Sequence, residues 1–154
     1  MADSTADVLT VRTAILDTIN DETYTNLPFT AKAAYLPEYM LQQLASLQVD
    51  VRIVMEDTEV IDRMTTPSSE DIHHYEITVQ MAVDPANTAA IDALMNRARR
   101  IAKLFPVNLT LTDPTPDAVV VANNHELYDQ FYLREYKVFY SRIELAVRQF
   151  ATNT

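Results

Sequence analysis

The sequence of 154 residues predicts an α+β fold, in which a mostly antiparallel β-sheet packs against two main helices. Two patterns lead to this class. Apolar and polar residues alternate in several segments, most regularly over 75–83, as they do in a strand with one buried face. Residues 91–105 instead carry an apolar stripe at helical spacing. The length suits one domain, so we expect a single domain over 1–154 whose second sheet face is exposed unless a partner covers it.

The N-terminal half begins with an amphipathic helix and continues into the first strands. Residues 6–20 place four apolar side chains at helical spacing: Val8, Val11, Ile15 and Ile19. Residues 29–35 suit a strand or a helix equally well, and Pro37 separates them from a short helix predicted over 38–46. Residues 49–55 alternate as a strand.

A long acidic connection, "EDTEVIDRMTTPSSED" over 56–71, follows that strand and predicts an exposed loop. The next segment, "EDIHHYEITVQMAVD", then starts the most regular strand of the chain. We expect Asp84 to cap the helix that comes after it, with Pro85 at its first position and Pro106 ending it.

The C-terminal third predicts three more strands. Residues 107–112 alternate, and the apolar run "AVVVA" over 118–122 suits a short strand. The segment 123–135 is irregular or partly helical. The last strand, over 136–149, is long and has apolar side chains on one face.

The composition excludes several classes of function. A net charge of −10 argues against a non-specific nucleic-acid binder, because such affinity depends on cations that neutralise phosphates. The absence of cysteine excludes disulfides and thiolate chemistry. The absence of glycine excludes the common phosphate-binding loops and the esterase elbow. The first residues lack the features of a signal peptide, and no apolar run is long enough to span a membrane, so we expect a soluble protein.

The candidate metal and catalytic residues do not form a recognisable site. His73 and His74 are adjacent in a predicted strand, where neighbouring side chains point to opposite faces, and His125 is distant in sequence. We therefore expect the two histidines at a solvated strand start. The carboxylates of 56–71 lack the ordered pattern and glycine of a calcium loop. Nothing places a serine such as Ser141 in a nucleophile's context. The sequence predicts no catalytic residue, no metal site and no cofactor.

The basic residues late in the second long helix have two interpretations. Arg97, Arg99, Arg100 and Lys103 complement the helix dipole and occupy its polar face. Alternatively, they meet an acidic neighbour. The clustered tyrosines of the C-terminal third also leave core packing and subunit contact open: Tyr128, Tyr132, Tyr136 and Tyr140.

The order and spacing of these segments resemble those of bacteriophage tail-terminator and tail-completion (head–tail neck) proteins. A leading helix is followed by "FTAKAAYLPEYMLQQL", "LQVDVRIVMED", the acidic segment, "YEITVQMAV", "IDALMNRARRIAKLF" and "YDQFYLREYKVFYSRIELAVR". In that family the closing segment reads as an aromatic followed by F-x-S-x-I-x-L, and here it is "FYSRIEL" over 139–145. The resemblance extends from the first helix to Arg148. The chain departs from many relatives in its lack of glycine and its acidity.

The resemblance implies a non-enzymatic virion protein, made in the cytoplasm of the bacterial host. It implies a homo-oligomeric ring, often a hexamer, that caps the tail tube and joins it to the head–tail connector. DNA passes through such a ring without specific binding, and no membrane is involved. On this interpretation we expect contacts with neighbouring subunits or the tube at Glu56, Asp57, Glu59, Asp62, Arg63, Arg97, Arg99, Arg100, Lys103 and Arg142.

Two alternatives remain open from the sequence. The first is another head–tail connector or head-completion protein. The more remote one is an acidic ligand-binding or enzymatic α+β domain.

Overall fold

The computed structural model describes residues 7–35, 44–54, 59–62, 68–111 and 118–152, and it confirms the α+β class with two main helices. The helices are α1 (Asp7–Asn20) and α2 (Thr88–Lys103), and a π-helical turn, η2, spans Tyr132–Tyr136. The strands are β1 (Lys32–Ala34), β2 (Gln48–Ile53), β3 (Glu59–Asp62), β4 (Ser68–Ala82), β5 (Thr110–Leu111), β6 (Ala118–Glu126) and β7 (Val138–Thr152). They form one sheet in the order β1-β2-β4-β7-β6-β5, with β3 also paired to β4.

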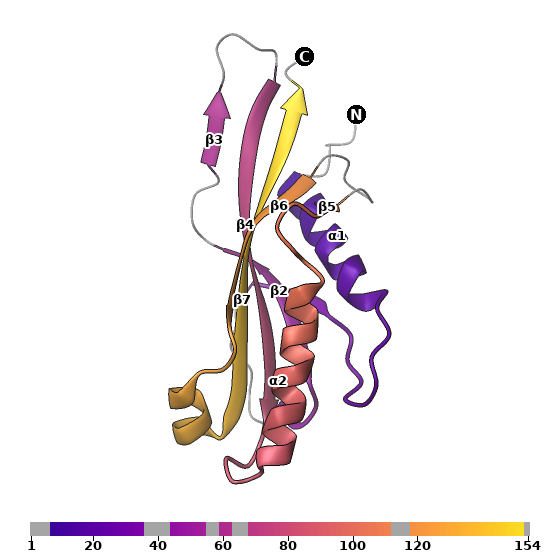
Figure 1. Cartoon of the computed structure of the whole chain (residues 1–154). Helices are drawn as coiled ribbons and strands as arrows, with labels where there is room; N and C mark the ends of the chain where they lie inside the picture. Colours follow the sequence, from indigo (N-terminus) through magenta and orange to yellow (C-terminus); the bar gives the residue numbers. More distant parts are fainter. Residues whose placement is uncertain (1–6, 36–43, 55–58, 63–67, 112–117, 153–154) are drawn as a thin grey trace.

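The central pair of the sheet is β4 and β7, which run antiparallel over their full length. Each has 15 residues, and the register runs from Ser68 opposite Thr152 to Ala82 opposite Val138. Figure 1 shows these two ribbons side by side along the long axis of the molecule, with both helices on one side of them. Their upper ends extend beyond the helices, where β3 flanks β4.

The hydrophobic core lies between the helices and one face of this central pair. Tyr75, Ile77 and Val79 of β4 point toward the helices and are fully buried. Their partners from the helices are Val11, Ile15 and Ile19 of α1, and Leu94, Ala98 and Ile101 of α2. The Tyr75 hydroxyl also donates a 2.7 Å hydrogen bond to the Val8 carbonyl, which ties the first turn of α1 to the sheet.

Both ends of α2 are held by asparagine side chains. The expected cap was wrong: Asn87 caps the helix, because its Oδ1 accepts from the Ala90 N–H at 3.2 Å. Asp84 instead accepts from the Ala86 N–H at 2.9 Å, so its side chain stabilises a turn that precedes the helix. At the other end, the Nδ2 group of Asn123 in β6 donates to the carbonyls of Ala102 and Phe105, at 2.9 and 2.8 Å. The Phe105 carbonyl thereby gains a donor, and the Ala102 carbonyl gains a side-chain donor besides the Phe105 N–H at 3.2 Å, at the end of the helix where carbonyls lack regular intrahelical partners.

The prediction of a loop over 56–71 was wrong for the two parts that the structure describes. Residues Glu59–Asp62 form β3, and residues 68–71 are the first residues of β4. These residues pair despite their acidic composition, because the hydrogen bonds between neighbouring strands join backbone groups and tolerate acidic side chains. β4 extends beyond β2 and offers an edge to which β3 pairs, with Glu59 opposite Ile72.

Other elements differ from their predicted bounds. Residues 29–35 contain a short strand, β1, which pairs in parallel with β2. The predicted helix over 38–46 lies mostly outside the described residues. The strand expected over 107–112 is described only as the two residues of β5, because Asn108 has φ 78° and interrupts the extended backbone. The run 118–122 is a strand as predicted, and β6 continues it to Glu126.

Left-handed backbone occurs although the chain has no glycine. In the described ranges, the residues with positive φ are Asn26 (62°), Leu27 (45°), Asn108 (78°) and Lys137 (54°). Asparagine tolerates this region, but leucine is uncommon there because its Cβ crowds the backbone. The turn at 26–27 therefore needs support from elsewhere in the fold.

None of the helices in the described ranges is long and apolar enough to cross a lipid bilayer.

Substitution of Asn123 tests how β6 holds the end of α2. We expect Asn123→Ala to lower the free energy of unfolding by about 1.5 kcal/mol, because the Phe105 carbonyl loses this donor and the Ala102 carbonyl keeps only backbone donors, including the Phe105 N–H. Asn123→Asp should cost more at neutral pH, because it also places a negative charge against the negative end of the helix dipole. Urea unfolding measures both changes. Asn96→Asp, at an exposed position of α2, is the control; equal losses for the two aspartate variants would contradict the assignment.

Candidate interaction surfaces

Five of the residues expected at an interface lie in β3 or close to it in the sequence, and four of them are acidic. Glu56, Asp57 and Arg63 lie outside the described residues. Glu59 and Asp62 are the first and last residues of β3, opposite Ile72 and Ser69 of β4. β2 and β3 pair with the same edge of β4 at different heights (Figure 1). β3 pairs with the part of β4 that extends past the helices.

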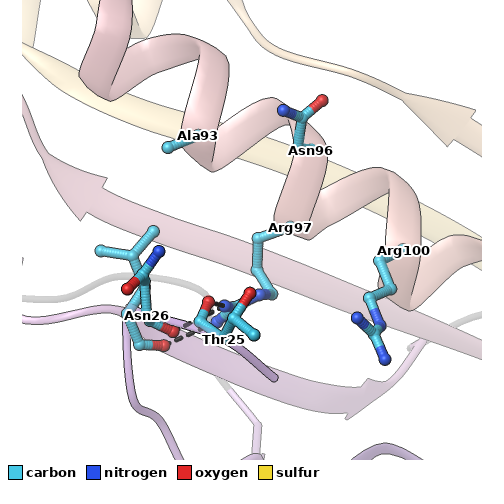
Figure 2. A pocket seen from close by; sticks show the side chains of 7 residues that line it. Thr25, Asn26, Ala93, Asn96, Arg97 and Arg100 are labelled. Carbon is cyan, nitrogen blue, oxygen red and sulfur yellow. Dashed lines mark hydrogen bonds between the residues drawn. The ribbon is translucent and has the colours of Figure 1, made fainter. Parts of the chain in front are cut away.

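Arg97 is buried, with 6% of its surface exposed, and holds the turn that contains the left-handed residues. Its guanidinium donates three hydrogen bonds to successive carbonyls: Thr25 at 2.7 Å, Asn26 at 2.6 Å and Leu27 at 2.6 Å. Figure 2 shows the side chain reaching from α2 to this turn, beside a hollow of about 230 Å³. The planar fork suits several acceptors at once, which a lysine ammonium would not match.

The prediction that Arg97 belongs to the polar face of α2 was therefore wrong. Its charge is satisfied inside the subunit, by the three carbonyls and by the ring of Tyr24, whose centroid lies 4.7 Å from the guanidinium carbon. A guanidinium with this many internal partners is not free to meet a neighbouring molecule. This role could not be predicted from the residue type or its spacing, since the acceptors are backbone atoms of a turn some 70 residues earlier.

The other cations of α2 lie on its outward side. Arg100 forms a 2.8 Å ion pair with Glu22. Arg99 and Lys103 are exposed, and neither makes an ion pair within the part of the chain that the structure describes. They are four residues apart and so neighbours on the helix surface, where like charges repel each other. This outward pair is the part of the predicted basic face that remains available to a partner.

The sheet face opposite the helices carries a polar network across its central strands. Arg52 of β2 pairs with Glu76 of β4 at 2.9 Å. Arg142 of β7 contacts Glu126 of β6 at 3.1 Å and Glu144 of its own strand at 3.5 Å. Burial acts to lower the pKa of Arg142, but the carboxylates of Glu144, Glu76 and Glu126 outweigh this effect and raise it. The face thus combines three carboxylates with two guanidinium groups.

Part of this face is buried within the subunit, although the sequence predicted an exposed face. Glu76, Thr78 and Gln80 of β4 expose 5%, 1% and 4% of their surfaces. The Tyr140 hydroxyl donates to Glu76 at 3.4 Å, and its ring stacks on that of Tyr132 in η2 at 4.9 Å. Burial, with the nearby Glu76 charge, raises the pKa of Tyr140 to about 12, so it remains a donor.

A hollow of about 340 Å³ opens in the same face, beside the polar network. Two small side chains, Ala122 and Ala146, are paired across β6 and β7 in its lining. Its polar lining includes His74, Asn124 and Glu144, with Val54 adding apolar surface. The two alanine side chains at this register position are small and leave room for the hollow.

An exposed aromatic cluster surrounds η2. Phe131, Tyr132 and Tyr136 expose 51%, 38% and 54% of their surfaces. Their rings contact one another with centroids 5.5 to 6.3 Å apart. Of the two interpretations of the tyrosines, packing describes Tyr140, while Tyr132 and Tyr136 lie on the surface. Phe131 was not among the residues predicted for packing or subunit contact, although it lies between Tyr128 and Tyr132 in the sequence.

The histidines and Ser141 do not form a catalytic pair. The Ser141 hydroxyl is buried and donates to the Glu126 carbonyl at 3.0 Å, so it accepts from the Nε2 of His125 at 2.8 Å. That histidine therefore holds its proton toward the serine and cannot remove one from it. Burial and the nearby charge of Arg99 lower the pKa of His125, which keeps it neutral.

His73 and His74 lie on opposite faces of β4, as their adjacency predicted. The expectation of a solvated strand start was wrong for His73, which exposes only 4% and packs edge-on near the Tyr75 ring at 6.5 Å. Both residues lie inside β4, because that strand begins at Ser68. Among the described residues, no group of three or more potential metal-binding side chains is gathered in one place.

Comparisons with known proteins identify the fold. No protein-family model matches the chain, and no curated protein matches it. Among solved structures, the chain is similar to a protein of the virion of a native gene transfer agent (GTA) particle, with 18% sequence identity and a TM-score of 0.53. The match covers 94% of this chain and 96% of the other. At this identity the likeness shows a shared fold over nearly the whole length of both chains.

Replacement of Arg97 tests its role in the fold. We expect Arg97→Met to lower the free energy of unfolding by about 3 kcal/mol, because it removes three charge-assisted hydrogen bonds from a left-handed turn. Arg97→Lys should recover only part of the loss. Arg99→Met, at an exposed position on the same helix, should change stability by less than about 0.5 kcal/mol. Urea unfolding measures all three, and a loss for Arg97→Met no larger than that for Arg99→Met would contradict the role.

Asp50 makes stability depend on pH. It is 2% exposed on the polar sheet face, and burial raises the pKa of its carboxyl from 3.8 to about 6 while Lys32 acts to lower it. Between these values the folded protein binds the proton more strongly than the unfolded chain, so the free energy of unfolding falls as pH rises through this window. Asp50→Asn removes this dependence.

Urea unfolding from pH 3.5 to 7.5 checks this expectation. Relative to wild type, Asp50→Asn should gain about 2 kcal/mol of stability between the two ends of the range. Asp92→Asn, at an exposed position of α2, should follow the wild-type curve. A constant difference between Asp50→Asn and wild type across the range would show that the carboxyl has the same pKa in the folded and unfolded states, and would contradict the expectation.

Proposed function

We propose that this protein is a structural component of a tailed-phage virion, of the tail-terminator type. In this role a homo-oligomeric ring, for which we propose six copies, caps the tail tube and joins it to the head–tail connector. The observation that carries the proposal is the fold shared with a virion-particle protein over 94% of the chain. The order of sequence segments, ending in "FYSRIEL", supports the same role.

The chemistry of the surface supports assembly rather than catalysis. The buried Ser141 and the neutral His125 hold each other in place and offer no nucleophile. The exposed features are instead those of interfaces: an aromatic cluster at η2 and a sheet face that is rich in carboxylates. A ring of like subunits needs two different patches on each copy. The two sides of this sheet differ, because the helices cover one side and the polar network lies on the other.

The acidity suits a conduit for DNA. A net charge of −10 repels phosphates, so DNA would pass through a ring of such subunits without adhering to it. Within this proposal, Glu59 and Asp62 of β3 remain contact candidates, together with the neighbouring Glu56, Asp57 and Arg63. Arg99, Arg100, Lys103 and Arg142 remain candidates as well, whereas Arg97 does not, because it is occupied internally.

Assembly on a tail tube tests the proposed role. The protein is expressed alone and together with the tail-tube protein encoded in the same genome, and both preparations are analysed by light scattering and negative-stain microscopy. We expect rings, free or at one end of the tube. A protein that stays monomeric with the tube present would refute the role. Rings bound to connector particles but not to tubes would favour a head-completion protein instead.

A further inference from the structure

We propose that successive copies of this chain associate by docking the outward cations of α2, Arg99 and Lys103, onto the carboxylates Glu126 and Glu144 on the sheet face of the next copy. The inference rests on the proposed assembly and names the surfaces that meet. Below, the two cations are the helix patch, and the two carboxylates with the adjoining hollow are the sheet patch.

The helix patch is a local excess of positive charge on an acidic protein. The chain has 12 basic and 22 acidic side chains, and four of the basic ones lie in the last two turns of α2. Arg97 is occupied by carbonyls and Arg100 by Glu22, which leaves Arg99 and Lys103 exposed without an ion pair in the described ranges. Since these two repel each other, an acidic partner would relieve the repulsion.

The sheet patch has a matching excess of negative charge. Glu126 and Glu144 share one guanidinium, that of Arg142, and their side chains remain 46% and 50% exposed. They point away from the core, since Ile143 and Leu145 on either side of Glu144 are buried beneath the helices. Because these two carboxylates share one cation, each can accept hydrogen bonds from a further donor while it keeps its contact with Arg142.

The hollow beside these carboxylates gives the patch a shape suited to long basic side chains. Ala122 and Ala146 offer apolar surface for the methylene groups of an arginine or lysine, while Glu144 lies in the same lining for the charged end, next to the subunit's own Arg142. The opening is about 340 Å³, and Asn124 adds a further polar group to its lining.

The two patches lie on opposite sides of the sheet, and this favours a second copy as the occupant. α2 covers one face, whereas Glu126 and Glu144 belong to the other. When the helix patch of one copy binds the sheet patch of the next, the first copy keeps a free sheet patch and the second keeps a free helix patch. Repetition of such a contact builds a ring or a filament rather than a closed dimer. The strong net negative charge also means that copies repel each other elsewhere, so the helix patch is where they attract.

Charge exchange between the patches tests the pairing. One variant, Arg99→Glu with Lys103→Glu, reverses the helix patch; another, Glu126→Lys with Glu144→Lys, reverses the sheet patch. Association is measured by sedimentation velocity and native mass spectrometry at low salt. We expect each variant alone to associate at least about 100-fold more weakly than wild type. An equimolar mixture of the two should associate again in alternating order, because each contact regains opposite charges.

Controls separate this pairing from general effects of charge and folding. Lys32→Glu with Lys137→Glu makes the same change in net charge at exposed positions outside both patches and outside the aromatic cluster, and should associate as wild type does. Glu126→Gln with Glu144→Gln avoids crowding Arg142 with like charges and should still weaken association. Higher salt should weaken the wild-type contact. Recovery in the mixture also shows that both reversed variants are folded.

The outcomes distinguish the pairing from the proposed role. If the reversed variants associate as wild type does, or if their mixture stays monomeric, the pairing is overturned, and rings on the tail tube would still support a terminator. If the helix-reversed variant forms wild-type rings yet fails to bind the tube, the helix patch faces the tube protein and the pairing is equally overturned.

Discussion

The antiparallel pair of β4 and β7 supports every other strand of the sheet. β2 and β3 pair with β4, β6 pairs with β7, and the edge strands β1 and β5 attach through β2 and β6. Alternation along these two strands also creates the two chemistries of the molecule. Side chains such as Ile77 and Ile143 meet the helices, while Glu76 and Arg142 between them form the polar network. A slip of one residue in this register would exchange the two faces.

The absence of glycine constrains the connections between these elements. Left-handed residues occur without the backbone freedom that glycine provides, and a side chain from a distant element stabilises the turn that contains two of them, Asn26 and Leu27. Arg97 binds the turn at Asn26 and Leu27, and Asn123 binds the end of α2. Polar side chains of helix and sheet thereby fix turns and helix ends that local sequence alone would leave strained or unsatisfied.

Periodicity predicted the fold class, both main helices and the central strands, because burial of one face imposes a repeat of 3.6 or 2 residues. It failed where pairing depends on backbone alone. β3 and the start of β4 have the composition of a loop, yet they pair with each other, and the start of β4 also pairs with β7. The site was harder to predict. Arg97 and Arg99 look alike in sequence, yet Arg97 is buried and binds a turn 70 residues away, whereas Arg99 is exposed.

The length of the central ladder has a consequence for how the chain folds. Residues 68–82 must wait for residues 138–152 before their pairing can begin, and α2, β5 and β6 lie between them in the chain. Contacts between such distant segments slow folding, because loop closure precedes any gain from pairing. During synthesis, the long edge of β4 therefore stays open until β7 emerges. Glu70, Asp71 and Glu76 are the acidic residues of β4, and their like charges would discourage premature pairing between the exposed strands of two nascent chains.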